Sequence, residues 1–592
     1  MGLGYARPMP ETDPTRPLQP LTHTDGQRLR RFAHLKGRQV DPQALAQVRD
    51  CIGECPVDGH RRDLLIEHLH ALNDRYRALH REHLVALAQE MGIPMAEVME
   101  VASFYHHFDI LPDGGEAPAL TVRVCDGLAC EMAGARDLLA RLPALLGRDD
   151  VRVVAAPCVG RCDTAPVAVV HQTPLQQATP QAVSLEANRQ LALVECAQTA
   201  TKLVALPYPD LDTYLASGGY QLAAAIVQGE ADPEDVLSAL EASGLRGLGG
   251  AGFPAARKWR IVREQPEPKY FAINIDEGEP GTFKDRHYLE RDPHRFLEGL
   301  LIAAQIVGTE RCIIYLRDEY HQCRAILQRE LAALEECPPC PLPEIELRRG
   351  AGAYVCGEES AMLESIEGKR GEPRMRPPYI AQVGLWGRPT LEHTFETLYW
   401  VRDIVEKGPA WFTSHGRHGR TGLRSFSVSG RVQSPGVKLA PAGITVQELI
   451  DEYCGGMQDG HQLYAYLPGG ASGGILPASL NQVPLDFDTL QPYGCFIGSG
   501  AVIVLSQQDR ARDAALNAMR FFAAESCGQC TPCRVGTAKA ATLMEAQAWD
   551  NATLEDLSQV MVDASICGLG QAAPNVVRCV QKYFAHEIEG QA

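Results

Sequence analysis

Two groups of closely spaced cysteines constrain the fold of this 592-residue chain more than any other feature of its sequence. The C-terminal group lies in ESCGQCTPCRVG, where two residues separate Cys527 from Cys530 and Cys530 from Cys533, and Cys567 follows 34 positions later. A C-x2-C-x2-C run with one remote cysteine is typical of a [4Fe-4S] cluster, in which each thiolate binds one iron. A zinc site is the alternative, but it would leave the close spacing of the middle cysteine unexplained. We therefore expect a [4Fe-4S] cluster on these four cysteines.

The N-terminal group consists of two cysteine pairs, and each pair lies where a predicted strand runs into a loop. Four residues separate Cys125 from Cys130, and three separate Cys158 from Cys162. Two loops at one end of a sheet can supply two sulfurs to each iron of a [2Fe-2S] cluster. A zinc site and four free thiols are the alternatives, and zinc ribbons usually have two-residue gaps. The spacing therefore favours a [2Fe-2S] cluster.

The composition excludes several classes of function. The chain has 56 Lys plus Arg against 74 Asp plus Glu, a net charge of −18, so it offers no basic field to nucleic acid or to an anionic membrane. No apolar run reaches the roughly 18 residues that a membrane span needs, and the first residues lack a secretory pattern. We expect a cytoplasmic protein, in which thiols stay reduced and closely spaced cysteines bind metal rather than form disulfides.

Hydrophobic periodicity divides the chain into segments of different fold class. The start is rich in Pro and Thr without an apolar period, and leucines at helical spacing follow. Strand and helix patterns then alternate in two α/β regions, before short strands with many turns and a helical end. The expected division is an N-terminal arm at 1–28, a helical bundle at 29–115, an α/β domain with the first cysteine group at 116–200, a larger α/β domain at 201–440, a small α+β domain at 441–510 and a helical domain with the second cysteine group at 511–592.

A glycine-rich stretch, GLRGLGGAGFPAARKW, lies near the start of the larger α/β domain. Gly247, Gly249 and Gly250 allow backbone amides to approach a phosphate or an aromatic ring, and Lys258 supplies a balancing positive charge. The spacing differs from the G-x-G-x-x-G fingerprint of dinucleotide-binding turns. For this stretch alone, a structural turn is the alternative interpretation.

Two acidic segments favour a ligand site over a simple turn. Acidic side chains bind phosphate poorly, but they suit ribose hydroxyls, a carboxamide and the N–H edge of a flavin. The three segments together therefore indicate a pocket for a flavin and a nicotinamide. The acidic segments are NIDEGEPGTFKDR, with Asn274, Asp276, Glu277 and Glu279 at a predicted strand end, and GAGAYVCGEESAM, with Gly357, Glu358 and Glu359 at a turn that opens a helix.

These motifs, with EGKRGEPRMRPPY and GLWGRPT, make residues 240–592 resemble the NADH-oxidising flavin subunit of respiratory complex I. Residues 30–200 resemble its thioredoxin-like [2Fe-2S] partner, through ASFYHHF, the two cysteine pairs and CVGRCDTAP. The resemblance implies a multidomain α/β and α+β fold. Its parts are a helical bundle plus a thioredoxin-like domain, a Rossmann-like FMN and NAD domain, a small ubiquitin-like β-grasp module, and a C-terminal helical bundle that carries the [4Fe-4S] cluster.

The resemblance also implies which residues bind the cofactors. Glu277, at the edge of the flavin ring in the family, is the expected catalytic residue that polarises or restrains the nicotinamide. His393 and Thr394 stand where the family commonly has two asparagines, so they must substitute for them if those asparagines bind FMN. The expected FMN residues are Gly247, Gly249, Gly250, Lys258, Asn274, Asp276, Glu277, Gly357, Glu358, His393 and Thr394, and the expected NAD(H) residues are Phe253, Glu279, Glu359 and Tyr379.

The fusion of both modules in one chain is similar to the β subunit of cytosolic NAD-dependent formate dehydrogenases. KGRQVDP, RRDLLIEHLH, VSGRVQSPGVKLAPAG and YLPGGASGGILPASLN favour this family over the alternative, the diaphorase subunit of NAD-reducing nickel-iron hydrogenases. The implied function passes electrons from a partner subunit through iron-sulfur clusters to FMN and as hydride to NAD+, in a reversible reaction. The implied partner is a molybdenum- or tungsten-pterin α subunit with additional iron-sulfur clusters. A scaffold that has lost FMN is a further alternative.

Two further cysteine pairs receive no role from these motifs. Cys51 and Cys55 in CIGEC, and Cys337 and Cys340 in CPPC, have ligand-like gaps but no second pair nearby, so we expect reduced surface thiols. Four histidines of the helical segment fit a solvated helix face better than a metal site, namely His68, His70, His80 and His83.

Overall fold

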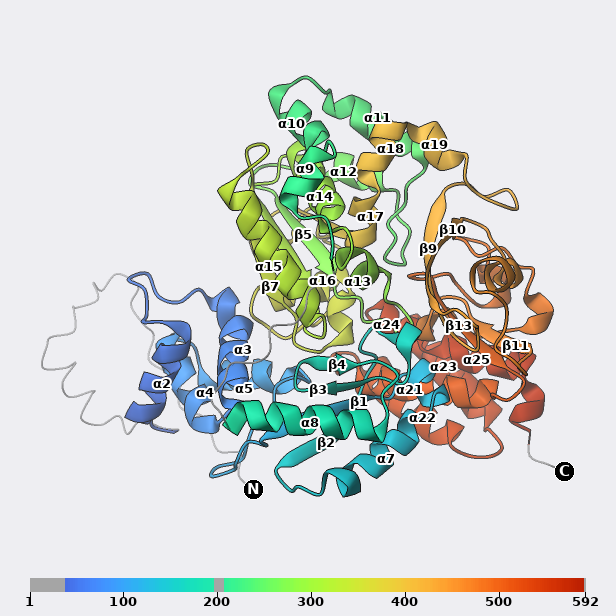
Figure 1. The fold of residues 1–592 in the computed structure, drawn as a ribbon, viewed down its shortest axis with the longest axis horizontal. Coiled ribbons are helices and arrows are strands. Elements are labelled where there is room, and N and C mark those ends of the chain that lie inside the picture. The colour runs from blue at the N-terminus through green and yellow to red at the C-terminus, as the bar shows by residue number, and fades with distance from the viewer. Residues whose placement is uncertain (1–37, 196–206, 590–592) are drawn as a thin grey trace, which may run out of the picture.

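The computed structural model describes residues 38–195 and 207–589 (Figure 1). The N-terminal arm expected at 1–28 lies outside these ranges. Within them, no helix is both long enough and apolar enough to cross a bilayer. The architecture is the multidomain α/β and α+β fold expected from the sequence, with its helical bundle, thioredoxin-like, Rossmann-like, β-grasp-like and C-terminal helical parts.

Within the described residues, a bundle of four helices comes first. Helix α2 begins where the Asp41 carboxylate accepts a hydrogen bond from the Ala44 amide at 2.8 Å, and it ends at Gly53, whose φ of +84° few other residues adopt. Leucines at helical spacing in α3, among them Leu65, Leu69 and Leu72, are buried. The helices are α2 (Pro42–Ile52), α3 (Leu65–Tyr76), α4 (Arg81–Glu90) and α5 (Met95–Phe104).

Some side chains expected at the surface of the chain are buried. His70 is 3% exposed and its Nε2 lies 2.8 Å from the Gly350 carbonyl oxygen, because α3 packs on the neighbouring α/β domain. His83 is also buried, and its Nε2 lies 2.8 Å from Oε1 of Gln47 in α2. The expectation of a solvated face is therefore wrong for these two histidines. The expectation of a surface thiol is likewise wrong for Cys340, which is buried, whereas Cys337 is exposed.

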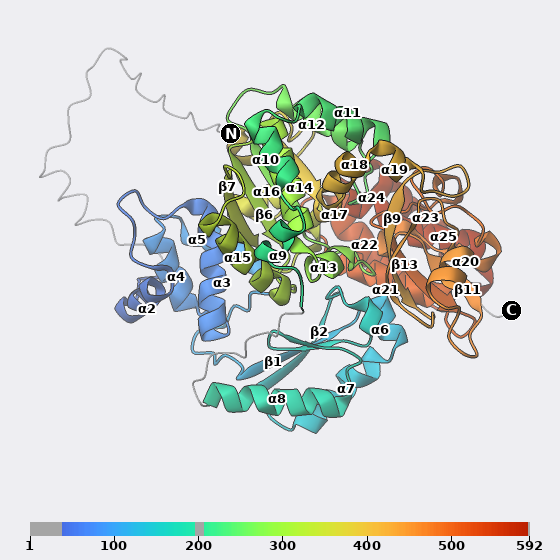
Figure 2. The same ribbon diagram turned by 45° about the horizontal axis from the view of Figure 1, so that its top comes forward.

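The thioredoxin-like domain has a four-stranded sheet in the order β2-β1-β3-β4. Strands β1 and β2 are parallel, so their carboxyl ends meet at one edge, with Cys125 opposite Ala156. Helices α7 and α8 lie side by side on the sheet (Figure 2). The elements are β1 (Leu120–Cys125), α6 (Leu128–Met132), α7 (Ala135–Leu146), β2 (Val151–Ala156), β3 (Ala168–Val170), β4 (Thr173–Leu175) and α8 (Pro180–Glu195).

The larger α/β domain is built on a parallel sheet in the order β7-β6-β5-β8. Helices cover both faces, and β5 and β6 are accordingly buried along nearly their whole length. The strands are β5 (Tyr270–Ile275), β6 (Arg311–Leu316), β7 (Glu344–Arg349) and β8 (Thr390–Thr394). The helices used below are α11 (Pro233–Ser243), α12 (Ala255–Arg263), α13 (Lys284–Leu289) and α16 (Glu359–Ile366).

A small β module and five helices complete the chain. The module is a five-stranded sheet in the order β10-β9-β13-β11-β12. Its strands are β9 (Leu423–Gly430), β10 (Gly436–Pro441), β11 (Leu463–Leu467), β12 (Leu476–Pro477) and β13 (Ala501–Ser506). The helices are α21 (Ala511–Ala524), α22 (Thr531–Met544), α23 (Asn551–Ala564), α24 (Gly568–Ala572) and α25 (Pro574–Tyr583).

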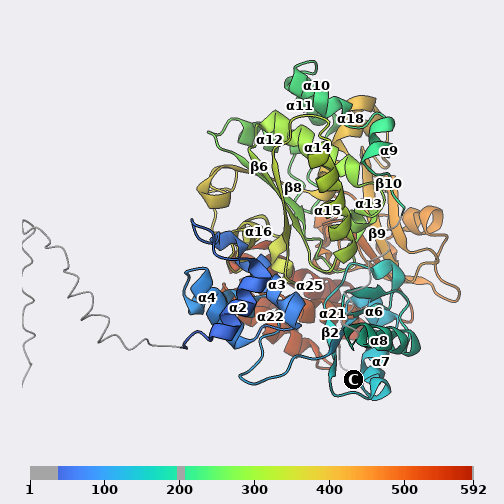
Figure 3. The ribbon, with the colours of Figure 1, turned by 60° about the vertical axis from the view of Figure 1, so that its left-hand side comes forward.

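Hydrogen bonds join these parts into one molecule. The Tyr105 hydroxyl of the helical bundle bonds to Ser365 Oγ at 2.8 Å, in the larger α/β domain. Asn517 of α21 donates to the Asp126 carbonyl oxygen, 2.9 Å away at the thioredoxin-like sheet edge. Figure 3 brings the α2–α4 helices to the front, with the C-terminal helices behind them. The helical bundle therefore contacts the larger α/β domain, and the edge of the thioredoxin-like sheet contacts the C-terminal helices.

Candidate functional site

The four cysteines of the N-terminal group converge at one edge of the thioredoxin-like sheet. Cys125 ends β1, Cys130 lies in α6, and Cys158 and Cys162 lie in the loop after β2. All four are buried, and the Cys158 and Cys162 sulfurs are 3.2 Å apart. The neighbouring thiols of Cys130 and Cys158 raise the pKa of Cys125 well above its ordinary value. Four thiols this close cannot all ionise unless a cation shares the space, so the donor set fits an iron-sulfur cluster.

A glycine lets the second cysteine loop lie against the larger α/β domain. Gly160 has a φ of +67°, and a Cβ atom on it would come within 2.3 Å of the Tyr320 hydroxyl oxygen. Arg286 of α13 donates from Nε to the Gly160 carbonyl oxygen at 2.9 Å. The loop that carries Cys158 and Cys162 is therefore held by side chains from another domain.

Three cysteines of the C-terminal group lie at the beginnings of helices, and Cys527 lies in the segment between α21 and α22. Cys530 precedes α22, Cys533 lies in its first turn, and Cys567 precedes α24. Burial raises the pKa of Cys533 to about 11 and that of Cys567 to about 12, and nearby thiols, including Cys527, contribute. The positive end of the α22 dipole favours thiolates at this place. The arrangement fits a [4Fe-4S] cluster.

The glycine-rich loop joins α11 to α12 and packs on the end of β8. A Cβ atom on Gly249 would lie 2.3 Å from Cγ2 of Thr394, so only glycine fits at this contact. The Leu248 amide donates to Oγ1 of Thr397 at 3.0 Å. Of the two residues that replace the family's asparagines, Thr394 therefore lies directly against the loop.

His393 has a different environment. It is 1% exposed, and its Nε2 accepts a hydrogen bond from the Trp259 indole N–H at 2.7 Å. Burial, together with the nearby Lys258 ammonium, lowers the pKa of His393 well below its ordinary value. The imidazole is therefore neutral and packs in the core rather than against the glycine-rich loop.

Asp276 leaves a buried oxygen without a partner at the carboxyl end of β5. Its Oδ2 is buried and accepts no hydrogen bond from the described residues. Burial raises the pKa of Asp276 to about 8. Asn274 aligns this segment with the second acidic segment, because its side-chain amide donates to the Gly357 carbonyl oxygen at 2.9 Å. An unsatisfied oxygen beside an aligned pair of turns fits a ligand that donates hydrogen bonds, such as the ribityl chain of FMN.

A charged cluster lies between α12, β8 and α16. The Lys258 ammonium donates to Glu392 Oε2 at 2.9 Å. Burial lowers the pKa of Lys258, but the Glu392 and Glu359 carboxylates outweigh burial and the pKa is raised. Arg376 pairs with both Glu358 and Glu359. Lys258 therefore provides the positive charge expected near a phosphate, but its ammonium group also interacts with the carboxylates of Glu392 and Glu359.

The other two acidic residues of the first segment hold the protein itself together. Both oxygens of the Glu277 carboxylate accept backbone amides of α13, those of Asp285 at 2.9 Å and Arg286 at 3.3 Å, and Oε2 also accepts the Tyr320 hydroxyl at 2.8 Å. Glu279 accepts the Tyr354 hydroxyl at 2.5 Å and a backbone amide of the small β module. These hydrogen bonds favour positioning roles for both carboxylates, and their expected contacts with FMN and NAD(H) stay predictions.

The two expected aromatic residues are accessible. Phe253 is 39% exposed and Tyr379 is 56% exposed, so a face of each ring can meet a ligand. The Arg257 guanidinium lies over the Phe253 ring, 5.6 Å from its centroid. Exposed aromatic rings beside the charged cluster suit a nucleotide base.

Arg317 is a central residue that the motifs did not reveal. It is 5% exposed and donates to the Cys158 carbonyl oxygen at 2.8 Å, as well as to the Glu277 carbonyl oxygen. Its charge is balanced by Glu319 at 2.7 Å. The only signal in the sequence is its position directly after β6, at the carboxyl edge where ligands bind in parallel sheets.

A cavity of about 280 Å³ lies between the first cysteine group and the carboxyl end of β5. Its lining includes Cys158 of the first cysteine group, Asp276 at the end of β5, and Glu525, which precedes the second cysteine group. Tyr354 also lines it, and its backbone amide donates to Glu525 Oε2 at 2.8 Å. The cavity therefore connects the loop of the first cysteine group with the end of the parallel sheet, and Glu525, two residues before Cys527, lies on its wall.

Comparison with protein families assigns each part of the chain. The Nuo51 FMN-binding domain matches residues 240–403, and the NADH-ubiquinone oxidoreductase-F iron-sulfur binding region matches residues 513–591. The thioredoxin-like [2Fe-2S] ferredoxin family matches residues 48–186, and the SLBB domain matches residues 425–476. FMN, NADH, a [2Fe-2S] cluster and a [4Fe-4S] cluster are therefore the cofactors of these parts.

Individual relatives agree with this assignment. The F 2 subunit of NADH-quinone oxidoreductase from Rhizobium meliloti (strain 1021) is 39% identical over 393 residues, which cover 64% of this chain and 93% of the relative. The corresponding F subunit from Aquifex aeolicus (strain VF5) is 39% identical, and the match covers 64% of this chain and 90% of the relative. Among solved structures, a chain of an NAD+-reducing [NiFe]-hydrogenase in the H2-reduced state is 34% identical with a TM-score of 0.77, and the match covers 90% of this chain and 93% of that chain.

Proposed function

We propose a function from one premise: this chain belongs to the family of NADH-quinone oxidoreductase F subunits. It is a diaphorase-type oxidoreductase subunit that acts on NADH, with FMN and two iron-sulfur clusters. Beyond this, we propose that it reduces NAD+ with electrons from formate, as the NAD-reducing subunit of a formate dehydrogenase. The proposed partner is a molybdenum- or tungsten-pterin catalytic subunit with further iron-sulfur clusters, in the cytoplasm.

The fusion of a thioredoxin-like [2Fe-2S] module and an FMN module in a single chain supports an NAD-reducing subunit, of a formate dehydrogenase or of a hydrogenase. The stretches KGRQVDP and VSGRVQSPGVKLAPAG support the formate dehydrogenase assignment. The second candidate is the diaphorase subunit of an NAD-reducing hydrogenase, and the likeness to the solved hydrogenase chain, over 90% of this chain, favours it. An assembly scaffold without FMN is a weaker candidate, because the chain retains both complete sets of clustered cysteines.

The geometry described above supports the following proposed division of roles. Cys125, Cys130, Cys158 and Cys162 would hold the [2Fe-2S] cluster, and Cys527, Cys530, Cys533 and Cys567 the [4Fe-4S] cluster. The glycine-rich loop, Asn274, Asp276 and Thr394 would hold FMN, with Lys258 at its phosphate. Bound FMN would supply the link between the nicotinamide, which transfers two electrons as hydride, and the iron-sulfur clusters, which transfer single electrons. Phe253, Tyr379 and Glu359 would orient the dinucleotide.

The described residues contribute positioning rather than proton transfer. Glu277 holds α13 and, through Tyr320, the loop of the first cysteine group. We therefore propose that Glu277 restrains the nicotinamide site by fixing these elements. Arg317 likewise fixes the backbone at Cys158 relative to the backbone at Glu277, because its guanidinium donates to both carbonyl oxygens. Asp276 offers an acceptor oxygen to a ligand hydroxyl or N–H group.

The decisive experiment purifies the chain with its native partner and compares electron donors. We expect NAD+ reduction with formate and none with H2, together with molybdenum or tungsten in the complex. Reduction with H2 alone, and nickel in the partner, would replace the first candidate by the second. A preparation that lacks flavin absorbance after anaerobic reconstitution with FMN would leave only the scaffold.

A further inference from the structure

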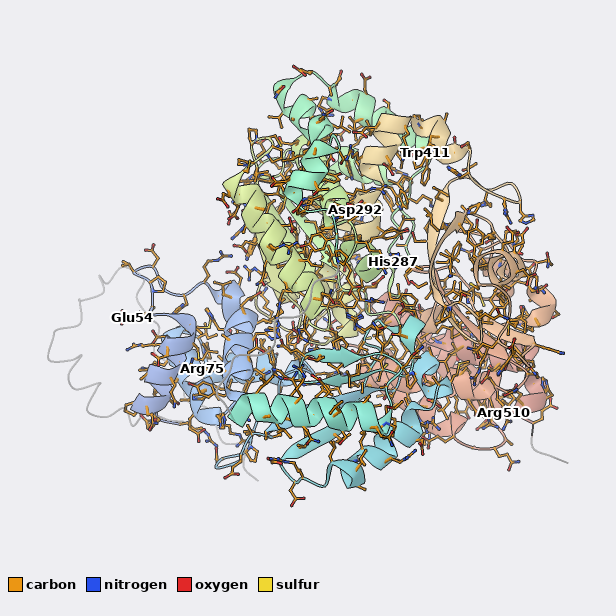
Figure 4. All side chains as sticks on the ribbon, viewed as in Figure 1. Glu54, Arg75, His287, Asp292, Trp411 and Arg510 are labelled. Atoms are coloured by element: carbon orange, nitrogen blue, oxygen red, sulfur yellow. The ribbon has the colours of Figure 1, made fainter. Side chains whose placement is uncertain are left out.

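The loop after helix α2 brings together three metal-binding side chains that the proposed function does not use. The sulfur of Cys55, Nε2 of His60 and a carboxylate oxygen of Glu90 all lie within 4.8 Å of one another. Figure 4 labels Glu54 in this loop at the outer edge of the helical bundle, away from the larger α/β domain. We propose that Cys55, His60 and Glu90 form a binding site for a divalent transition-metal ion of the zinc class.

His60 supplies the strongest argument for a ligand. Its side chain is 5% exposed, and its Nε2 is buried without a hydrogen-bond partner among the described residues. A buried polar atom with no partner is costly, so this nitrogen calls for a ligand. The ring of His68 packs edge-on against the His60 ring, with the two centroids 5.3 Å apart.

Glu90 ends helix α4 and is already oriented. Nε of Arg49, in α2, donates to both of its carboxylate oxygens at 3.1 Å. An ionised carboxylate has about four acceptor positions, so the guanidinium leaves room for a metal on Oε1, which lies 4.0 Å from His60 Nε2. An oriented ligand with a hydrogen-bonded second partner is typical of protein metal sites.

Cys55 completes the set with an accessible donor. The thiol is exposed and donates only a long hydrogen bond, 3.6 Å, to the Pro56 carbonyl oxygen. In a tetrahedral zinc site, ligand atoms lie about 3.5 Å apart. The three donor atoms here lie within 4.8 Å of one another, so the loop would move inward by about 1 Å when the ion binds. The thiol of Cys51, the other member of CIGEC, instead meets the Tyr76 hydroxyl.

The donor types identify the class of ion. One sulfur, one imidazole nitrogen and one carboxylate oxygen suit Zn2+ or Co2+, whereas Mg2+ and Ca2+ prefer oxygen donors alone. Because Cys55 is exposed, water can complete the fourth position. The ion would join the end of α2 to the end of α4 and so fasten the helical bundle.

Co2+ is the probe for this site, because a cobalt–thiolate bond absorbs light that cobalt bound to oxygen and nitrogen alone does not. The experiment adds CoCl2 to the complete holoprotein, with its clusters and flavin in place, and records difference spectra. We expect one equivalent to produce the thiolate band, and ZnCl2 to displace it. Iron content is measured before and after, so that exchange at the cluster cysteines is detected.

Matched variants locate the site. C55S should abolish the thiolate band, and H60Q and E90Q should each weaken binding by about tenfold or more. C51S is the control, because its thiol belongs to the same motif but lies outside the cluster, and it should bind cobalt as the unmodified protein does. The proposal is overturned if no thiolate band appears with the iron content intact, or if C55S and C51S bind cobalt equally.

Discussion

At the scale of single residues, buried side chains that belong to no motif organise the centre of the molecule. Arg317 reaches the backbone of the first cysteine loop and the backbone at Glu277, so one guanidinium connects two candidate sites. Tyr354 plays a similar part between Glu279 and Glu525. Removing a buried charged side chain that has several partners strongly destabilises a protein, because the partner of opposite charge is left buried and unpaired.

Replacing Arg317 by alanine should therefore lower the free energy of unfolding by about 3 kcal/mol, because Glu319 is left as an uncompensated buried charge. The [2Fe-2S] content, measured by spin quantification in the reduced protein, should fall with it. Arg291→Ala is the control, since that side chain is exposed. Full [2Fe-2S] content in the Arg317 variant would contradict the assigned role.

Asp276 predicts a pH dependence of stability. Burial raises its pKa from 3.8 to about 8, so the folded, flavin-free protein keeps a proton there that the unfolded chain has released. Stability from this group is full below about pH 4 and is lost as the pH rises toward 8. We expect Asp276→Asn to flatten the fall of the melting temperature between these pH values. An unchanged slope in the flavin-free variant would show that Asp276 does not titrate there.

At the scale of elements, each cysteine group is placed by the ends of regular structure. Parallel pairing of β1 and β2 brings the first two loops to one edge, and the starts of α22 and α24 bring the second group together. The loop with Cys158 and Cys162 also depends on Gly160, whose positive φ and close neighbour Tyr320 leave no room for a side chain.

Gly160→Ala should therefore displace this loop and reduce the [2Fe-2S] content several-fold. Gly134→Ala is a matched control, because Gly134 also has a positive φ, +95°, but a Cβ atom added there would meet nothing within 4 Å. Both variants carry backbone strain, and only the first adds a clash. A difference between the visible circular dichroism spectra of the two variants would therefore report the effect of the clash on the cluster. Equal spectra would show that the clash with Tyr320 does not displace the cysteine loop.

At the scale of the whole molecule, the domains share buried polar contacts. The Tyr105 hydroxyl bonds to Ser365 Oγ and the Lys369 carbonyl oxygen, both at 2.8 Å, and Arg348 donates to the Asp63 carbonyl oxygen at 2.9 Å. The helical bundle is thus tied to the larger α/β domain, with the cavity between the candidate sites beside it. We expect these parts to unfold together.

Tyr105→Phe tests this coupling. Loss of the hydroxyl leaves the Lys369 carbonyl oxygen without this donor, whereas Ser365 Oγ keeps the Tyr315 hydroxyl at 2.9 Å, so the free energy of unfolding should fall by about 1 kcal/mol. Urea denaturation followed by flavin fluorescence and by far-ultraviolet circular dichroism should keep one common midpoint in the unmodified protein. Tyr76→Phe serves as the control, because its hydroxyl meets Arg75 and Cys51 within the helical bundle. Separate midpoints in the unmodified protein would contradict a joined unit.

The cysteine spacings in the sequence predicted both iron-sulfur clusters, because cluster ligands need particular residues at short, fixed spacings. The fold of each domain and the binding of FMN and NAD(H) were predicted through the resemblance to the flavin subunit of complex I and its [2Fe-2S] partner. The burial of His393 against Trp259, the bonds that occupy Glu277 and the bridging position of Arg317 emerged only from the folded molecule. These contacts join residues from different helices, strands, loops or domains, and their distances depend on how the sheets and helices pack. Spacing along the chain can therefore indicate which nearby residues bind a cluster, whereas the hydrogen-bond partners of a buried polar atom are determined by the packing of the whole molecule.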